Sequence, residues 1–332
     1  MPATKPWLET LTLDKLHRVA VNIGSPCSGT KTARVEGIRN VVSSVKSRGE
    51  KPLSLLSIDM GIRNLAFAHF TAPKAGDETP AVYDHPTLQA WRRVAIASSS
   101  ASQNAAKANK LLRDVGSVED DVGVATKESF EPMDYARHAY ALVRDMLATY
   151  HPNHIIIERQ RFRSGGRAAV PEWTIRVGVF EGMLYAVLRT LIEQGDLEVE
   201  VEPMWPSQVN RFWLEGQDRD VVPSLGKKLT GREVKRAKIN IVGGILERHA
   251  GPGTGAGKIS ISEEIQPFAK EFVATWKKEI KTKKNEMKSI PKLDDLADSL
   301  LQGLAWIEWQ DHRKLLEILG SKAVDMETGC ML

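Results

Sequence analysis

The stretch Leu55-Leu-Ser-Ile-Asp-Met-Gly-Ile-Arg-Asn-Leu-Ala-Phe-Ala-His-Phe70 holds two apolar runs of the length expected for buried strands. Between the runs lie Asp59, Gly61, Arg63 and Asn64. A carboxylate in a buried strand is costly unless it is paired or binds a metal, so Asp59 is a candidate ligand. The alternative is a plain hairpin with Asp59 in its turn. Acidic residues on neighbouring elements would favour the interpretation of Asp59 as a metal ligand.

The chain has 332 residues, a formal net charge of +4 and enough apolar residues for a large core. This mild basicity is compatible with a nucleic-acid partner but does not require one. The two cysteines, Cys27 and Cys330, lie far apart and lack metal-ligand spacing, which argues against a disulfide framework and a zinc site. No apolar run is long enough to cross a bilayer, so we expect a soluble, intracellular protein with no membrane partner.

Residues 7–44 are predicted to form two short helices, the first ending at Gly24. The turn between them, Ser28-Gly-Thr-Lys31, resembles that of a SAP domain, a small DNA-binding module. Its phosphate-facing positions would be Lys31, Arg34 and Arg39. The alternative is a helical hairpin that packs on the main domain. We place a SAP-like hairpin at 1–48 and the main domain at 49–332.

The chain that follows alternates strands and helices. A strand is expected at 89–96, a flexible insertion at 97–128 and an amphipathic helix at 133–150. The apolar run His154-Ile-Ile-Ile-Glu158 then predicts a strand that pairs in parallel within an α/β sheet. Ligands gather at the carboxyl ends of such strands, where Glu158 would lie, although a solvated strand-end glutamate is the alternative.

Basic residues cluster in the second half of the chain. Directly after Glu158, arginines alternate with an aromatic residue and two glycines, a composition suited to phosphate contacts and base stacking. The members of this loop are Arg159, Arg161, Phe162, Arg163 and Arg167. A helix at 174–193 and a strand at 197–201 follow. A basic helix is expected at 227–245, with Lys227, Lys228 and Lys235 as DNA contacts, although most charge runs are simply solvated.

A late helix begins near Asp294, Asp295 and Asp298. Asp294 and Asp298 are four residues apart and therefore lie on one face. Capping and the helix dipole explain Asp294 and Asp295, but they explain Asp298 poorly because it lies one turn further in. Like charges at this spacing destabilise a helix unless a cation lies between them.

Together, these residues would form one carboxylate cluster: Asp59, Glu158, Asp294, Asp295 and Asp298. Several neighbouring carboxylates cannot all ionise without counter-charge. Mg²⁺, or Mn²⁺, is the usual ion with oxygen ligands beside phosphates. Two such ions can activate water and stabilise the leaving oxygen in phosphodiester hydrolysis.

Three motifs in order strengthen this hypothesis: Ile-Asp-Met-Gly-Ile-Arg-Asn-Leu-Ala, Ile-Ile-Glu-Arg-Gln-Arg-Phe-Arg-Ser and Asp-Asp-Leu-Ala-Asp-Ser-Leu-Leu-Gln. In these motifs the chain resembles the fungal mitochondrial Holliday-junction resolvases, RuvC-type members of the RNase H-like superfamily. The resemblance implies an RNase H-like mixed sheet flanked by helices, a mitochondrial location and a homodimer that cuts four-way DNA junctions symmetrically.

Carried onto this sequence, the resemblance makes Asp59, Glu158, Asp294 and Asp298 the catalytic metal ligands. Asp295 is an additional ligand or a replacement for Asp294. We also expect Arg63 among the DNA contacts. The loop from Arg161 to Arg163 is a candidate for opening the junction centre, by hydrogen bonds or by wedging Phe162 into the base stack.

Other functions fit part of the pattern. The Asp-x-Gly-x-x-Asn run at Asp59 also resembles the phosphate loop of actin-like sugar kinases, but the second glycine-rich loop of that class is missing. A non-catalytic DNA-binding protein and a general RNase H-like nuclease are the remaining alternatives. We expect the junction-resolving endonuclease, because carboxylates are present at every expected position.

Overall fold

The computed structural model describes residues 7–44, 51–62, 65–76, 81–94, 131–160, 170–215, 229–249, 259–281 and 293–325. The expected insertion at 97–128 lies outside these residues. Within them, the helices include none of the length and hydropathy that a membrane span requires.

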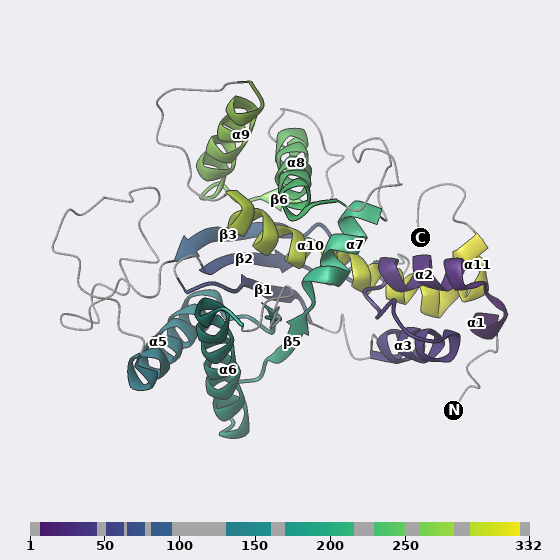
Figure 1. Cartoon of the computed structure of the whole chain (residues 1–332), viewed down its shortest axis with the longest axis horizontal. Coiled ribbons are helices and arrows are strands. Elements are labelled where there is room, and N and C mark those ends of the chain that lie inside the picture. The colour runs from purple at the N-terminus through teal and green to yellow at the C-terminus, as the bar shows by residue number, and fades with distance from the viewer. Residues whose placement is uncertain are drawn as a thin grey trace.

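A six-stranded mixed sheet forms the centre of the molecule, in the order β5-β4-β1-β2-β3-β6 (Figure 1). Neighbours pair antiparallel from β1 to β3, and β4 pairs in parallel with both β1 and β5. The strands are β1 (Leu53–Asp59), β2 (Leu65–Ala72), β3 (Thr87–Val94), β4 (His154–Glu158), β5 (Glu200–Met204) and β6 (Ser260–Ile261). The expected α/β class and mixed sheet are therefore confirmed.

Helices cover both faces of the sheet (Figure 1). On one face, α5 (Pro132–Tyr150) and α6 (Glu172–Glu193) pack on Leu56, Ile58 and Ile157. On the other, α10 (Leu293–Leu319) packs on β1 and β2. Against α10 pack α7 (Pro206–Glu215), α8 (Gly231–His249) and α11 (Ser321–Asp325), and α9 (Gln266–Lys281) packs against α8. Both faces of β1 are thus buried, as its continuous apolar sequence predicts.

The N-terminal hairpin consists of α1 (Trp7–Thr10), α2 (Leu13–Asn22) and α3 (Lys31–Ser43). The side chains of Thr12 and Thr30 cap α2 and α3. Gly24 follows α2 with a φ of +66°, the left-handed conformation that the predicted C-cap requires.

This hairpin shares its hydrophobic core with the sheet domain. A Cβ on Gly24 would lie 2.3 Å from the Trp309 ring of α10. Two side chains of α10 also donate to the backbone at the end of α2: His312 Nδ1 to Asn22 O and Arg313 Nε to Ile23 O, both at 2.8 Å. The hairpin is therefore docked on the C-terminal half of α10.

Several boundaries differ from the sequence predictions. The fifth strand runs from Glu200 to Met204 and not from 197 to 201. It is an edge strand, which tolerates the missing N–H of Pro203. The basic helix starts at Gly231 and not at 227, because Thr230 and Glu233 form a capping box in front of it. No sequence pattern predicted α7, α9 or β6.

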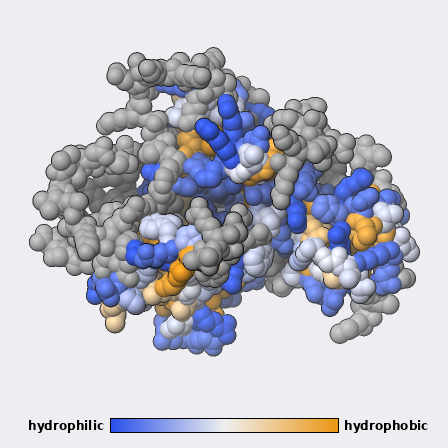
Figure 2. All heavy atoms as spheres, viewed as in Figure 1, coloured by the Kyte–Doolittle hydropathy of each residue, from blue (hydrophilic) through white to orange (hydrophobic). Residues whose placement is uncertain are grey.

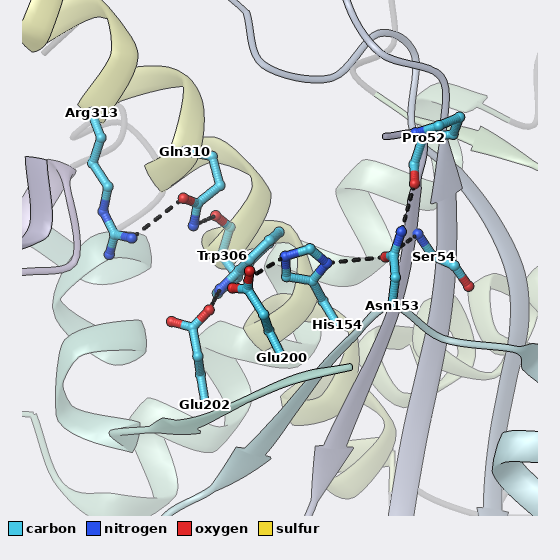
Figure 3. A network of polar contacts seen from close by, with 9 residues as sticks. All are labelled: Pro52, Ser54, Asn153, His154, Glu200, Glu202, Trp306, Gln310 and Arg313. Atoms are coloured by element: carbon cyan, nitrogen blue, oxygen red, sulfur yellow. Dashed lines mark hydrogen bonds and ion pairs between the residues drawn. The ribbon is translucent and has the colours of Figure 1, made fainter. Parts of the chain in front are cut away.

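A network of polar contacts fixes the edge of the sheet where β4 begins (Figure 3). Asn153 bonds Pro52 O at 2.7 Å and Ser54 N at 2.9 Å, and its Oδ1 lies 3.0 Å from His154 Nδ1. On the other side of the ring, His154 Nε2 is 3.5 Å from Glu200. Nearby, Trp306 Nε1 donates to Glu202 at 3.3 Å. The starts of β1, β4 and β5 are thereby linked to each other and to α10.

Candidate active site

The first two carboxylates of the predicted cluster lie on adjacent parallel strands. Asp59 is the last residue of β1 and Glu158 the last of β4, and the preceding residues Ile58 and Ile157 are paired in register. The N–H of Met60 donates to Glu158 Oε2 at 3.4 Å. Both acids are therefore held at the carboxyl edge of the sheet, where side chains from neighbouring strands meet.

Buried polar contacts place α10 over this edge. Ser57 Oγ donates to Ser299 O at 2.8 Å, and Gln302 Nε2 donates to Ser57 Oγ at 3.2 Å and to Ile58 O at 3.1 Å. Ser299 lies one residue from Asp298, and Ser57 lies two residues from Asp59. Because all three side chains are buried, they fix the register between the helix and the strand.

The electrostatics of Asp59 show that the carboxylates have been brought together. Its side chain is only 6% exposed. Burial raises the pKa of Asp59 well above its usual range, and the negative charges of Glu158, Asp298 and Asp295 raise it further. Burial also raises the pKa of Asp298, against the effect of Lys238, and the charges of Glu158 and Asp294 act in the same direction as burial.

Two lysines of α8 pair with two of the three helix aspartates. Lys235 Nζ lies 2.6 Å from Asp294 Oδ2, and Lys238, only 8% exposed, forms an ion pair with Asp298. Burial alone would raise the pKa of Asp294, but the hydrogen bond and charge of Lys235 lower it overall. Asp294 is therefore held by Lys235, whereas the charge of Asp295, like that of Asp298, raises the pKa of Asp59.

The donor set fits a hard divalent cation by its chemistry. It consists of carboxylate oxygens whose mutual repulsion a cation would relieve. Within the described part of the chain, no three such groups lie close enough together to enclose an ion. Counter-charge comes from Lys235 and Lys238 instead. Ion binding would therefore require the carboxylates to turn toward a common centre.

The predicted DNA contacts are distributed over several places. Lys31 is exposed at the start of α3, while Arg34 donates to Leu13 O at 3.4 Å and Arg39 pairs with Glu9 at 2.8 Å. Arg39 and Arg34 thus contribute to the hairpin itself, whatever else they bind. Seven further predicted contacts lie outside the described residues: Arg63, Arg161, Phe162, Arg163, Arg167, Lys227 and Lys228.

Sequence reasoning missed part of this site. Ser57, Ser299 and Gln302 read as ordinary core or helix residues, and no spacing rule pairs them. The sequence did give an indication for Lys238, because it lies three residues after Lys235 and therefore on the same face of the predicted basic helix. Without knowledge that α8 packs on α10, that face could not be assigned to the carboxylates.

The mixed sheet with acidic residues at its carboxyl edge and on the late helix has the RNase H-like architecture that the motifs predict, with an acidic site. A family model described as mitochondrial resolvase Ydc2 / RNA splicing MRS1 matches residues 55–316. The chain belongs to this family, which confirms the family resemblance seen in its motifs. The family description covers two activities, a resolvase and an RNA-splicing protein.

Two curated relatives carry the name cruciform cutting endonuclease 1, mitochondrial. The Schizosaccharomyces pombe protein is 27% identical over 191 residues, which cover 56% of this chain and 62% of that protein, less than two thirds of its length. The Saccharomyces cerevisiae protein is 24% identical over 298 residues, covering 83% of this chain and 74% of the relative.

A solved structure supports the fold. The crystal structure of the yeast mitochondrial Holliday junction resolvase Ydc2 superposes with a TM-score of 0.57 at 23% identity, covering 94% of this chain and 98% of that one. The chain therefore shares the architecture of a known resolvase over nearly its whole length.

Proposed function

We propose that this chain is a metal-dependent endonuclease that resolves four-way DNA junctions in mitochondria. The observation that carries the proposal is the convergence of Asp59 from β1, Glu158 from β4 and Asp298 from α10 at one edge of the sheet. An RNA-binding or splicing role would need no buried cluster of mutually repelling carboxylates. The names of both relatives and of the family agree with the activity and with the mitochondrial location.

Within this proposal, Asp59, Glu158, Asp298 and Asp295 are the metal ligands. We favour Asp295 over Asp294 as the fourth ligand. The charge of Asp295 raises the pKa of Asp59, whereas Asp294 is paired with Lys235. Mg²⁺ or Mn²⁺, two ions to a site, would supply the Lewis acidity that activates water and stabilises the leaving oxygen.

A lysine of α8 completes the proposed chemistry. If Asp298 turned toward a cation, Lys238 would lose its partner and leave positive charge beside the site, next to the Lys235–Asp294 pair. A phosphodiester that enters would meet this charge, which favours its binding.

The test is a nicking assay on a fixed four-way junction and on linear duplex, with Mg²⁺ and with EDTA. Wild type should make paired, symmetric cuts in the junction alone. EDTA and Asp298→Asn should abolish the cuts, whereas Asp196→Asn, in the exposed turn after α6, should not. Junction binding without cuts in Mg²⁺ would support a non-catalytic DNA-binding protein, and equal cutting of duplex or hybrid would support a general nuclease.

A second copy of the chain is the partner that the proposed reaction requires. A four-way junction is cut at two opposed strands, and the residues that the structure describes contribute one such carboxylate cluster. Apolar side chains emerge on the outer surface of α5 and α6, where Figure 2 shows hydrophobic patches among polar ones. Trp173, Ile175 and Val179 of α6 are each at least 40% exposed. Such a patch is typical of an interface.

We therefore propose that α6 packs against its equivalent in a homodimer. Ile175→Glu with Val179→Glu should convert the dimer to a monomer in sedimentation analysis and abolish paired cutting. Leu13→Glu, an equally exposed apolar position on α2, should leave the dimer intact. A wild-type protein that is monomeric both free and on a junction would contradict this proposal.

A further inference from the structure

Glu181 is a buried carboxylate that belongs to none of the motifs. It lies on α6 and is only 5% exposed. Its Oε2 accepts a hydrogen bond from the N–H of Gln160 at 3.1 Å, and its Oε1 lies 3.4 Å from Arg159 Nη1. Burial raises the pKa of Glu181, while the Gln160 N–H and the Arg159 guanidinium act in the opposite direction.

These two contacts hold the two residues that directly follow Glu158. The Gln160 side chain in turn donates from Nε2 to Glu158 Oε2 at 3.2 Å. On the other side, the N–H of Arg159 donates to Met204 O at 2.7 Å, and its guanidinium lies 5.9 Å from the Trp205 ring centroid. The chain after Glu158 is thus fixed between α6 and the end of β5.

A purely structural role explains this arrangement poorly. Burying a carboxylate beside another acid is unfavourable, and the Glu158 charge does raise the pKa of Glu181. An amide at this position could accept the same bond from Gln160 without that repulsion. A carboxylate is favoured if its charge is needed to hold Arg159 and, through Gln160, to orient Glu158.

We propose that Glu181 is a positioning residue for the acidic site, acting on Glu158 through Gln160 and Arg159. The inference rests on the proposed function, because it treats Glu158 as a metal ligand. Outer-shell groups of this kind orient the ligand, and their loss lowers metal affinity by about 10- to 100-fold.

The experiment measures Mn²⁺ binding to the DNA-free protein, from the loss of the free-ion signal in electron paramagnetic resonance. Glu181→Ala should weaken binding about tenfold. Glu181→Gln should weaken it less, because an amide oxygen still accepts from the Gln160 N–H. The matched control is Glu172→Gln, which removes an exposed carboxylate paired with Arg176 on the same helix and should change nothing. Unchanged binding in both Glu181 variants would overturn the inference.

A double-mutant cycle separates positioning from a general effect on folding. In a Glu158→Gln background, Glu181→Gln should cause no further loss of Mn²⁺ affinity, because its effect passes through Glu158. A full additional loss in that background would overturn the inference.

The junction assay distinguishes a failure of this inference from a failure of the proposed function. Wild type that binds Mn²⁺ and cuts junctions, with Glu181 variants that behave like wild type, would overturn the inference alone. Wild type that neither binds Mn²⁺ nor cuts would overturn the proposed function, and the inference with it.

Discussion

At the scale of single residues, Asp59 combines two features that usually exclude each other. It is buried, which disfavours its charge, and it is surrounded by other acids, which disfavours the charge again. A folded protein keeps such an arrangement at the expense of stability, and a functional site gives a reason for keeping it. The same repulsion is what a bound cation would remove.

Asp59→Asn should therefore lower junction cleavage by about a thousandfold, a loss of about 4 kcal/mol in transition-state stabilisation. Junction binding in Ca²⁺ or EDTA should be retained, because the amide replaces the carboxylate with nearly the same shape. Single-turnover cleavage and a gel-shift titration would measure the two effects. Lost binding together with a lower melting temperature would instead make Asp59 a structural residue.

His69 gives a pH dependence that is separate from the acidic site. It lies on β2 beside Ser54, at 2.9 Å from its hydroxyl, and burial lowers its pKa to about 4. The unfolded chain, with a histidine pKa of about 6.5, binds more protons between these values. Stability should therefore fall as the pH falls from about 6.5 to about 4, by up to about 3 kcal/mol, and this contribution should not fall further below pH 4.

Urea unfolding at several pH values, without metal, would measure this dependence. His69→Gln keeps a polar side chain without a titrating ring, so its stability should vary less over the same interval. His85→Gln, at an exposed histidine, is the control and should keep the wild-type slope. Equal slopes for wild type and His69→Gln would contradict the prediction.

At the scale of elements, α10 relates the acidic site to the rest of the fold. Its first turns carry the aspartates, its middle is hydrogen-bonded to β1, and its last turns bind the N-terminal hairpin. Close contacts leave it little freedom, since a Cβ on Gly303 would lie 2.3 Å from the Phe70 ring. The position of Asp298 is therefore set by packing along most of the helix.

Gln302→Ala tests this coupling. It removes two buried donor bonds and leaves Ser57 Oγ and Ile58 O without them, which should cost about 1–3 kcal/mol of unfolding free energy. It should also raise the Mg²⁺ concentration needed for half-maximal cleavage, because the helix register over Asp59 is relaxed. Ile318→Ala, at an exposed position of the same helix, should change neither quantity. A stability loss without any change in metal requirement would limit Gln302 to the fold.

At the scale of the whole molecule, the hairpin and the sheet domain form one core. The elements with strong local patterns were predictable: both strands of the opening stretch, the helix ending at Tyr150 and the strand ending at Glu158. The contacts between them were not, because the hairpin's apolar stripe and α10 are separated by most of the chain. For the same reason the carboxylates could be proposed from the motifs, whereas Lys238, Gln302 and Glu181 could not.

Gly24→Ala tests the shared core. The variant must accept a left-handed φ and a clash with Trp309, which together should cost about 3 kcal/mol or more. The matched control is Gly195→Ala, where φ is +77° and no atom lies within 4 Å of the added Cβ, and it should cost about 1–2 kcal/mol. Calorimetry should show one transition for both variants. A separate, low-temperature transition of the hairpin in Gly24→Ala would show that the cores are independent.

Because the hairpin is docked on α10, the helix sets a fixed distance between the hairpin and the acidic site. From Asp298 to Arg313 the helix rises about 22 Å, which corresponds to roughly six or seven base pairs of duplex. If the hairpin binds one arm of a junction, the distance from this contact to the cleavage site is fixed by the helix and not by a flexible linker. Junction arms shorter than this distance would lose the contact with the hairpin but would still reach the cleavage site.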